Sequence, residues 1–135
     1  MTVEGRALSE RRVLVVDDEA NIVKVVTRIL EAMGYVVLGA SSVAEAAQVL
    51  RASGPVDCAV LDFSLDGATC AEAYGALTSI QPDLRVLISS GFSQSEVAHG
   101  FPQASECAGF LKKPFGLDSL VKAVASACEK SEAAA

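Results

Sequence analysis

Five short apolar runs recur along the chain, each bounded by charged residues, glycine or proline. They cover residues 12–16, 35–38, 58–61, 85–88 and 109–112. Most are rich in β-branched and other aliphatic residues, and their length suits strands better than helices. The run 58–61 is apolar throughout, which is typical of a central parallel strand covered on both faces. The pattern therefore predicts five β-strands.

Helical patterns fill the gaps between the predicted strands. Apolar residues recur at helical spacing across residues 20–33, and a glycine follows. Serine and glutamate three residues apart form capping-box signatures that open two further helices, after Ser42 and after Ser93. The second of these should be short, because Gly100 and Pro102 interrupt it after about two turns. The helix after Ser42 should reach about residue 52, and the remaining two helices are predicted over residues 70–80 and from 117 onward.

Strands that alternate with helices through short loops predict an α/β fold: a doubly wound, five-stranded parallel sheet with helices on both faces. We expect the flavodoxin-like strand order 2-1-3-4-5, whose crevice lies beyond the carboxyl ends of strands 1 and 3. A chain of 135 residues with 51% hydrophobic residues fits one domain. We assign residues 1–10 to a flexible arm, 11–130 to the domain and 131–135 to a frayed tail.

Composition excludes several classes of function. The net charge of −6, without a cluster of basic residues, disfavours direct nucleic-acid binding. No apolar run approaches the roughly eighteen residues that a membrane span needs, so we expect a cytoplasmic protein without membrane insertion. The four cysteines have no metal-binding spacing and are expected to be reduced packing residues. They are Cys58, Cys70, Cys107 and Cys128.

Chemically active side chains follow the predicted strands. Asp17 and Asp18 end the first strand and Asp62 ends the third, while Ser90 and Lys113 follow the fourth and fifth. Three carboxylates at one edge of a sheet repel one another unless a cation lies between them, and oxygen ligands suit Mg²⁺, with Mn²⁺ as a substitute. Asp62 could then attack a phosphorus atom, with Lys113 and Ser90 contacting the transferred oxygens.

Each residue alone also has an ordinary structural explanation. The acidic pair would favour the start of the next helix, and Asp62 would cap a turn. Ser90 would be a turn residue and Lys113 a strand end. Their joint occurrence, in register with the strand pattern, favours the chemical interpretation.

Four blocks of the sequence resemble the receiver domain of two-component response regulators, which belong to the CheY-like superfamily. These blocks are residues 13–19, 60–62, 87–91 and 112–115, and the resemblance covers about residues 11–130. It implies that Asp62 accepts a phosphoryl group from a histidine kinase or a histidine phosphotransfer protein. Asp18 and Asp62 would bind Mg²⁺ directly, Asp17 mainly through water, and Ser64 through its backbone carbonyl.

The resemblance also assigns residues to the switch. Ser90 would be the switch hydroxyl and Lys113 the partner of the phosphoryl group. Phe110 matches the aromatic residue that turns inward on activation, although it is equally explained as a half-buried strand residue. The Lys113–Pro114 peptide bond is often cis in this family.

The sequence departs from the family after the acceptor. Asp66 and Cys70 stand where a proline and a glycine are usual, although Glu72 matches an acidic position without a gap. We therefore expect the loop after Asp62 to follow a different course, and Asp66 with the glycine after it suits a tight turn.

The leading interpretation is a phosphorylation-controlled switch rather than an enzyme acting on other substrates. Phosphorylation would change the face made by the short helix after Ser93, the strand 109–112 and the last helix. This face would then bind an unidentified output partner or form a homodimer. We expect no DNA-binding module after the last helix, and either a single-domain regulator or the receiver of a hybrid kinase. Alternatives are a pseudo-receiver that binds partners without phosphorylation and a haloacid-dehalogenase-type phosphatase, which would need an acid at Ser64. A flavodoxin is disfavoured, because the first loop is acidic.

Overall fold

The computed structural model describes the backbone of residues 11–134 and side chains through residue 128. The predicted arm over residues 1–10 lies outside the described residues, as does residue 135. The division into arm, domain and tail stays a prediction.

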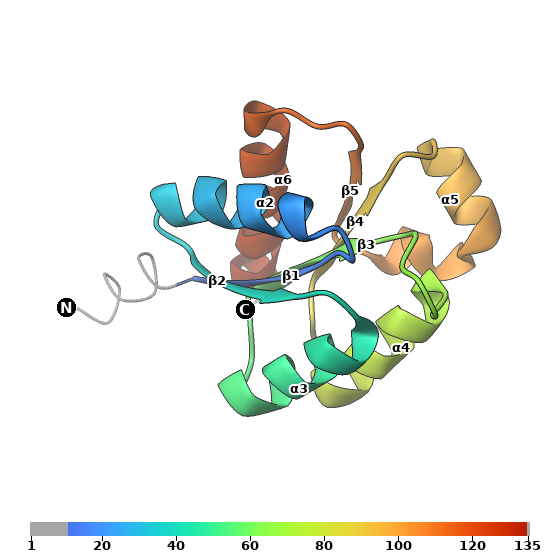
Figure 1. Cartoon of the computed structure of the whole chain (residues 1–135), viewed down its shortest axis with the longest axis horizontal. Helices are drawn as coiled ribbons and strands as arrows, with labels where there is room; N and C mark the ends of the chain where they lie inside the picture. Colours follow the sequence, from blue (N-terminus) through green and yellow to red (C-terminus); the bar gives the residue numbers. More distant parts are fainter. Residues whose placement is uncertain (1–10, 135) are drawn as a thin grey trace.

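A parallel five-stranded sheet forms the centre of the molecule (Figure 1). Its strands are β1 (Arg12–Val16), β2 (Val36–Ala40), β3 (Cys58–Asp62), β4 (Val86–Ser90) and β5 (Gly109–Lys112). They lie in the order β2-β1-β3-β4-β5, which confirms the predicted topology. The strands β1, β3 and β4 are almost wholly buried, as their continuous apolar runs predict.

The helices cover both faces of this sheet. They are α2 (Ala20–Ala32), α3 (Val43–Ser53), α4 (Cys70–Ile80), α5 (Gln94–Gly100) and α6 (Leu117–Ala134). Figure 1 shows α2 and α6 on one side of the sheet and α3 and α4 on the other. The helix α5 is short as predicted, and a 3₁₀ helix that the sequence pattern did not reveal, η1 (Pro102–Glu106), follows it. Residues 131–134, expected to fray, are helical in α6, because alanine, glutamate and serine can all continue a helix.

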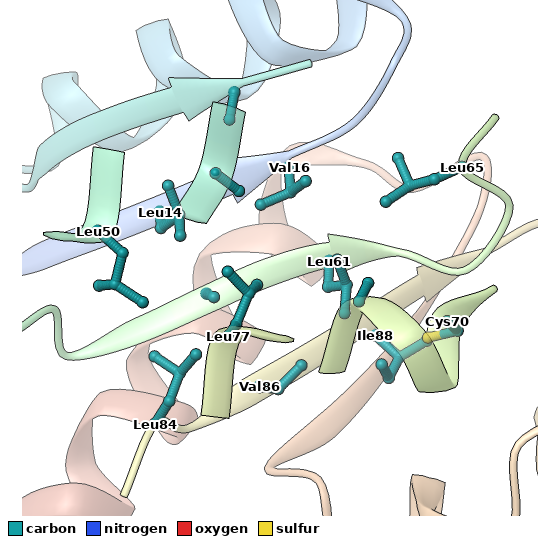
Figure 2. Close-up of a cluster of buried hydrophobic side chains, with 14 of the residues drawn as sticks. Leu14, Val16, Leu50, Leu61, Leu65, Cys70, Leu77, Leu84, Val86 and Ile88 are labelled. Atoms are coloured by element: carbon teal, nitrogen blue, oxygen red, sulfur yellow. The ribbon is translucent and has the colours of Figure 1, made fainter. Parts of the chain in front are cut away.

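The core consists of two apolar layers separated by the sheet. Alternate residues of β1 and β3 supply each layer, since successive strand side chains point to opposite faces. Leu14, Val16, Leu61 and Ile88 face Leu50 of α3 and Leu77 of α4 (Figure 2). On the other face, buried residues of the strands pack with α2 and α6: Val13, Val15, Cys58, Val60, Leu87, Val26, Leu30, Leu120, Val124 and Cys128.

The strand register brings the carboxyl ends of four strands to one edge. Leu61 of β3 pairs with Val16 of β1, and Asp62 pairs with Ser89 of β4. Ser90 pairs with Lys112 of β5, so it belongs to the strand and not to the following turn. Pairing with β5 explains why β4 runs two residues past its predicted end.

Candidate functional site

Three carboxylates converge at this edge of the sheet. Asp17 and Asp18 follow β1, and Asp62 is the last residue of β3. One carboxylate oxygen from each lies within 4.8 Å of the others. Asp17 and Asp62 are only 2% and 4% exposed, so their charges have little water to screen them. The predicted clustering of these residues is therefore present in the structure.

The Lys113 ammonium lies between two of these carboxylates. Its Nζ is 2.9 Å from Asp17 Oδ2 and 3.3 Å from Asp62 Oδ1. The Lys113 backbone N–H donates to the Ser90 carbonyl at 2.7 Å, which fixes where the side chain starts. The Lys113–Pro114 peptide bond is cis, as the family resemblance suggested. Burial lowers the pKa of Lys113, but the hydrogen bond to Asp17 and the charge of Asp62 outweigh it and raise the pKa overall.

Asp62 itself is held in an environment that disfavours its charge. Burial, followed by the charge of Asp17, raises its pKa above the ordinary value. The backbone N–H of Ser64, which donates to Asp62 Oδ1 at 3.2 Å, and the ammonium of Lys113 act in the opposite direction. A carboxylate so placed gains from a second cation nearby.

The Ser90 hydroxyl is buried at the end of β4, beside the site. Its Oγ accepts a hydrogen bond from the backbone N–H of Phe92 at 2.9 Å, and only 1% of the residue is exposed. Among the described residues, no acceptor takes a hydrogen bond from the Ser90 hydroxyl. The Ser90 hydroxyl can therefore donate a hydrogen bond while its oxygen accepts one from Phe92.

Comparison with known sequences decides the family. The family model of the response regulator receiver domain matches residues 13–125. This chain belongs to that family. Its receiver domain is 33% identical over 124 residues to the sensor kinase CckA of Brucella abortus, and 30% identical over 118 residues to the transcriptional regulatory protein GlrR of Escherichia coli. These matches cover 89% and 87% of this chain, but only 13% of CckA and 26% of GlrR.

Solved structures agree with the fold. A response regulator receiver domain protein of Clostridium thermocellum has a TM-score of 0.81 at 23% identity, and the match covers 93% of this chain and 99% of that one. The response regulator TrrA of Thermotoga maritima, in complex with Mg²⁺ and BeF, has a TM-score of 0.74 at 26% identity, covering 87% of this chain and 98% of that one. Within residues 11–134, no helix of the receiver domain is long and apolar enough to cross a bilayer.

Phe110 is half-buried in β5, opposite Ile88 of β4. Its ring packs against the core layer that contains α3, α4 and α5. It also borders a cavity of about 240 Å³, whose lining includes Val97 of α5 and Ala104 of η1. The receiver domain therefore has open space beside the Phe110 ring.

The loop after Asp62 lacks the usual proline and glycine of the family, and other contacts hold it in place. The Asp66 backbone N–H donates to Asp18 Oδ2 at 3.0 Å, which ties the loop to the acidic cluster. Gly67 has a φ of +82°, a conformation that favours glycine, as the predicted turn requires. Leu65 is only 8% exposed and inserts into the core, and Cys70 is buried at the start of α4.

Sequence reasoning missed two features around this loop. The first is an edge-to-face contact between Phe63 and Phe92, with ring centroids 5.9 Å apart, which links the loops after β3 and β4. The second is a capping box at the start of α4, where Thr69 and Glu72 bond to each other's backbone N–H groups. The Thr69–Glu72 spacing is the signal that could have revealed it, because Ser93 and Glu96 form the same box as predicted.

Replacing Thr69 by alanine is expected to lower the free energy of unfolding by about 1 kcal/mol, because the backbone N–H of Glu72 loses its acceptor. Urea denaturation measures the change. Thr78→Ala in the same helix is the matched control: its hydroxyl bonds only to carbonyls one turn back, so the change should be near zero. Equal losses in both variants would contradict the capping role.

Proposed function

We propose that Asp62 accepts a phosphoryl group from a phosphohistidine of a histidine kinase or histidine phosphotransfer protein. The observation that carries the proposal is the convergence of Lys113 with Asp17, Asp18 and Asp62 at one edge of the sheet. An ammonium and a cluster of acids are what phosphoryl transfer requires, since the protein contributes mainly positioning and charge. Family membership supports the same assignment.

The acidic cluster fits a divalent metal. Carboxylate oxygens are the ligands that Mg²⁺ prefers, and Mn²⁺ accepts the same set. Asp18 and Asp62 would bind the metal directly, Asp17 mainly through water, and Ser64 through its backbone carbonyl. The bound metal would supply positive charge to the oxygens of the transferred group. The complex of the similar T. maritima protein with Mg²⁺ and BeF supports this reading.

In the transfer step, an Asp62 carboxylate oxygen forms a bond to phosphorus while the bond from phosphorus to the imidazole nitrogen breaks. The nitrogen keeps the electron pair, and the donor histidine ends as neutral imidazole after a proton balances its charge. Lys113, already 3.3 Å from Asp62, then pairs with the new phosphoryl oxygens. Asp62 must be ionised for this attack, which the Lys113 ammonium favours and which a bound metal would favour further.

The switch follows from the position of Ser90. If the Ser90 side chain rotates so that its hydroxyl donates to a phosphoryl oxygen, its Oγ moves away from the backbone N–H of Phe92, which would lose the acceptor that it now has. The loop from β4 to α5 would move with it, and Phe110 would turn toward the released space. The face made by α5, β5 and α6 would change and bind an output partner or a second copy of the domain.

We also propose in what kind of protein, and in which compartment, this receiver domain works. The chain spans between about an eighth and about half of the length of the curated relatives that it matches, which include a kinase and transcriptional regulators. A stand-alone regulator and the receiver of a hybrid kinase both fit, in the cytoplasm in either case. The pseudo-receiver alternative is disfavoured by the complete acidic cluster and Lys113, and the phosphatase alternative by the serine at position 64.

Acetyl phosphate tests the proposed function directly. The wild-type protein is incubated with Mg²⁺ and acetyl phosphate, and intact mass spectrometry follows the product. One phosphoryl adduct, stable in acid and labile in base, is expected on the wild type and none on Asp62→Asn. If neither protein is modified, a purified phosphorylated kinase domain replaces acetyl phosphate, and failure with both donors refutes the phosphoacceptor role.

Mg²⁺ should also stabilise the domain. Binding to the folded state alone adds about 2.7 kcal/mol when the free metal is 100 times its Kd. Thermal denaturation is therefore expected to show a Tm several degrees higher with Mg²⁺ than with a chelator. Asp18→Asn should lose most of this shift, whereas Asp83→Asn, at an exposed site outside the acidic cluster, should keep it. A wild-type Tm that does not respond to Mg²⁺ would refute the metal site.

A further inference from the structure

Two of the four cysteines lie in contact on the far side of the sheet from α3 and α4. Cys58 is the first residue of β3, and Cys128 lies in α6. Their sulfur atoms are 3.9 Å apart, although 70 residues separate them along the chain. Both thiols are free, and the two residues are 0% and 1% exposed. A disulfide has a sulfur separation of about 2.05 Å, so the atoms need to approach by roughly 2 Å.

We propose that Cys58 and Cys128 form a modification site that a peroxide oxidises to a reversible disulfide. The contact between the two sulfur atoms carries this proposal, because among the described residues no other pair of cysteines is joined by a sulfur–sulfur hydrogen bond. The site lies apart from the phosphoryl site and needs no phosphorylation. It would give the receiver domain a response to oxidants in addition to its response to a kinase.

The surroundings of the pair distinguish its two thiols. With both protonated, Cys128 donates to Cys58; once Cys128 loses its proton, Cys58 becomes the donor. This hydrogen bond lowers the pKa of Cys128 against the effects of burial and of Asp57, and the nearby Arg11 guanidinium lowers it further. The same hydrogen bond, together with burial, raises the pKa of Cys58. Cys128 is therefore the thiol that more readily becomes the attacking thiolate.

The other two cysteines are poor competitors for the oxidant. Burial raises the pKa of Cys70 to about 12 and that of Cys107 to about 11. Cys107 is more exposed than Cys128, but its thiolate is rarer at neutral pH. Among the described residues, the 3.9 Å contact also gives an oxidised sulfur of this pair a second sulfur within reach, so the disulfide is expected between Cys58 and Cys128.

The reaction balances with hydrogen peroxide as the oxidant. The Cys128 thiolate attacks one peroxide oxygen, the O–O bond breaks, and hydroxide leaves and becomes water with one proton. Cys58, deprotonated in the same step, attacks the sulfenic sulfur, the S–O bond breaks, and a second water forms. Two thiols lose two hydrogen atoms, and one peroxide becomes two waters. A dithiol reductant reverses the reaction by exchange.

The disulfide should leave phosphoryl transfer nearly unchanged. Cys58 starts β3 and Asp62 ends it, so roughly 13 Å of strand separates them at about 3.3 Å per residue. The cross-link instead ties α6, part of the proposed output face, to the centre of the sheet. It also closes a long loop, which stabilises the folded state by restricting the unfolded chain.

The test treats the whole chain with hydrogen peroxide under native conditions, alkylates the remaining thiols and maps peptides by mass spectrometry. The expected product has lost two hydrogen atoms, contains a Cys58–Cys128 cross-link and keeps Cys70 and Cys107 alkylated. Its Tm should rise by roughly 5 °C or more, and a dithiol should reverse both changes. Cys128→Ser should give no cross-link, whereas Cys70→Ser, the matched control, should form it as the wild type does.

Several results would overturn the proposal. They are four alkylated thiols after peroxide treatment, a cross-link that forms only in denaturant, or a different pair such as Cys70 with Cys107. Peptide mapping of the wild type decides among them even if Cys128→Ser folds poorly. Acetyl phosphate labelling of the oxidised protein separates the two sites, because failure of the phosphoacceptor role leaves the cross-link result intact.

Discussion

Replacing Phe101 by alanine is expected to lower the free energy of unfolding by about 3–5 kcal/mol, the usual cost of removing a buried aromatic side chain. Phe101 is fully buried between α5 and η1. Its ring meets Tyr74 of α4 edge to face, with centroids 5.5 Å apart. The substitution removes this contact and leaves a cavity in the core layer that carries β3 and β4. Urea denaturation with a fixed m-value measures the loss.

The matched control is Phe92→Ala, the same substitution at a side chain that is 49% exposed. It removes the edge-to-face contact with Phe63 from a ring that is about half in solvent, so the loss should be no more than about 1 kcal/mol. If Phe101→Ala is no more destabilising than this control, the ring does not hold α5 and η1 against the sheet.

Replacing Lys113 by alanine is expected to slow phosphorylation by acetyl phosphate roughly 10²–10³-fold, the typical cost of losing one donor that stabilises developing charge. The same change should increase Mg²⁺ affinity. The Lys113 ammonium holds Asp17 at 2.9 Å and Asp62 at 3.3 Å, and its positive charge repels a metal at the same carboxylates. An increase of about tenfold is expected, measured by the Mg²⁺ dependence of Tm or by calorimetry.

The opposite signs of these two effects exclude general misfolding as their cause, since a damaged site would lose both activities. Lys112→Ala is the control, because Lys112 is exposed and its ammonium donates to the Lys113 carbonyl at 3.2 Å rather than to a carboxylate of the acidic cluster. It should change neither rate nor affinity by more than about twofold, as is usual for exposed charges. Weaker Mg²⁺ binding in Lys113→Ala would contradict the proposed competition.

The features predicted from sequence are those that local patterns determine. The apolar runs indicated β1 and β3, and the parallel order then placed Asp17, Asp18 and Asp62 at one edge, because carboxyl ends of parallel strands meet. The helix α4 (Cys70–Ile80) was predicted with both of its ends, because apolar residues recur at helical spacing and a Gln-Pro-Asp turn follows it.

The features that were missed depend on contacts between distant residues. Lys113 lies 96 residues from Asp17, and Asp66 lies 48 residues from Asp18, so neither hydrogen bond has a local pattern. The extension of β4 through Ser90 depends on pairing with Lys112 of β5. The burial of Phe101 was hidden because Gly100 and Pro102 interrupt the helical pattern on either side of it. The packing of the sheet, rather than the local sequence, determines each of these.

The central claim is that Asp62 carries the phosphoryl group, and chemical trapping tests it most directly. Borohydride reduces an aspartyl phosphate to homoserine, which marks the acceptor permanently. The protein is treated with Mg²⁺ and acetyl phosphate, or with a phosphorylated kinase domain, then reduced, digested and mapped by mass spectrometry. Homoserine at position 62, and at no other aspartate, is the predicted result. Homoserine at position 17, 18 or 66, or its absence with both donors, would contradict the assignment.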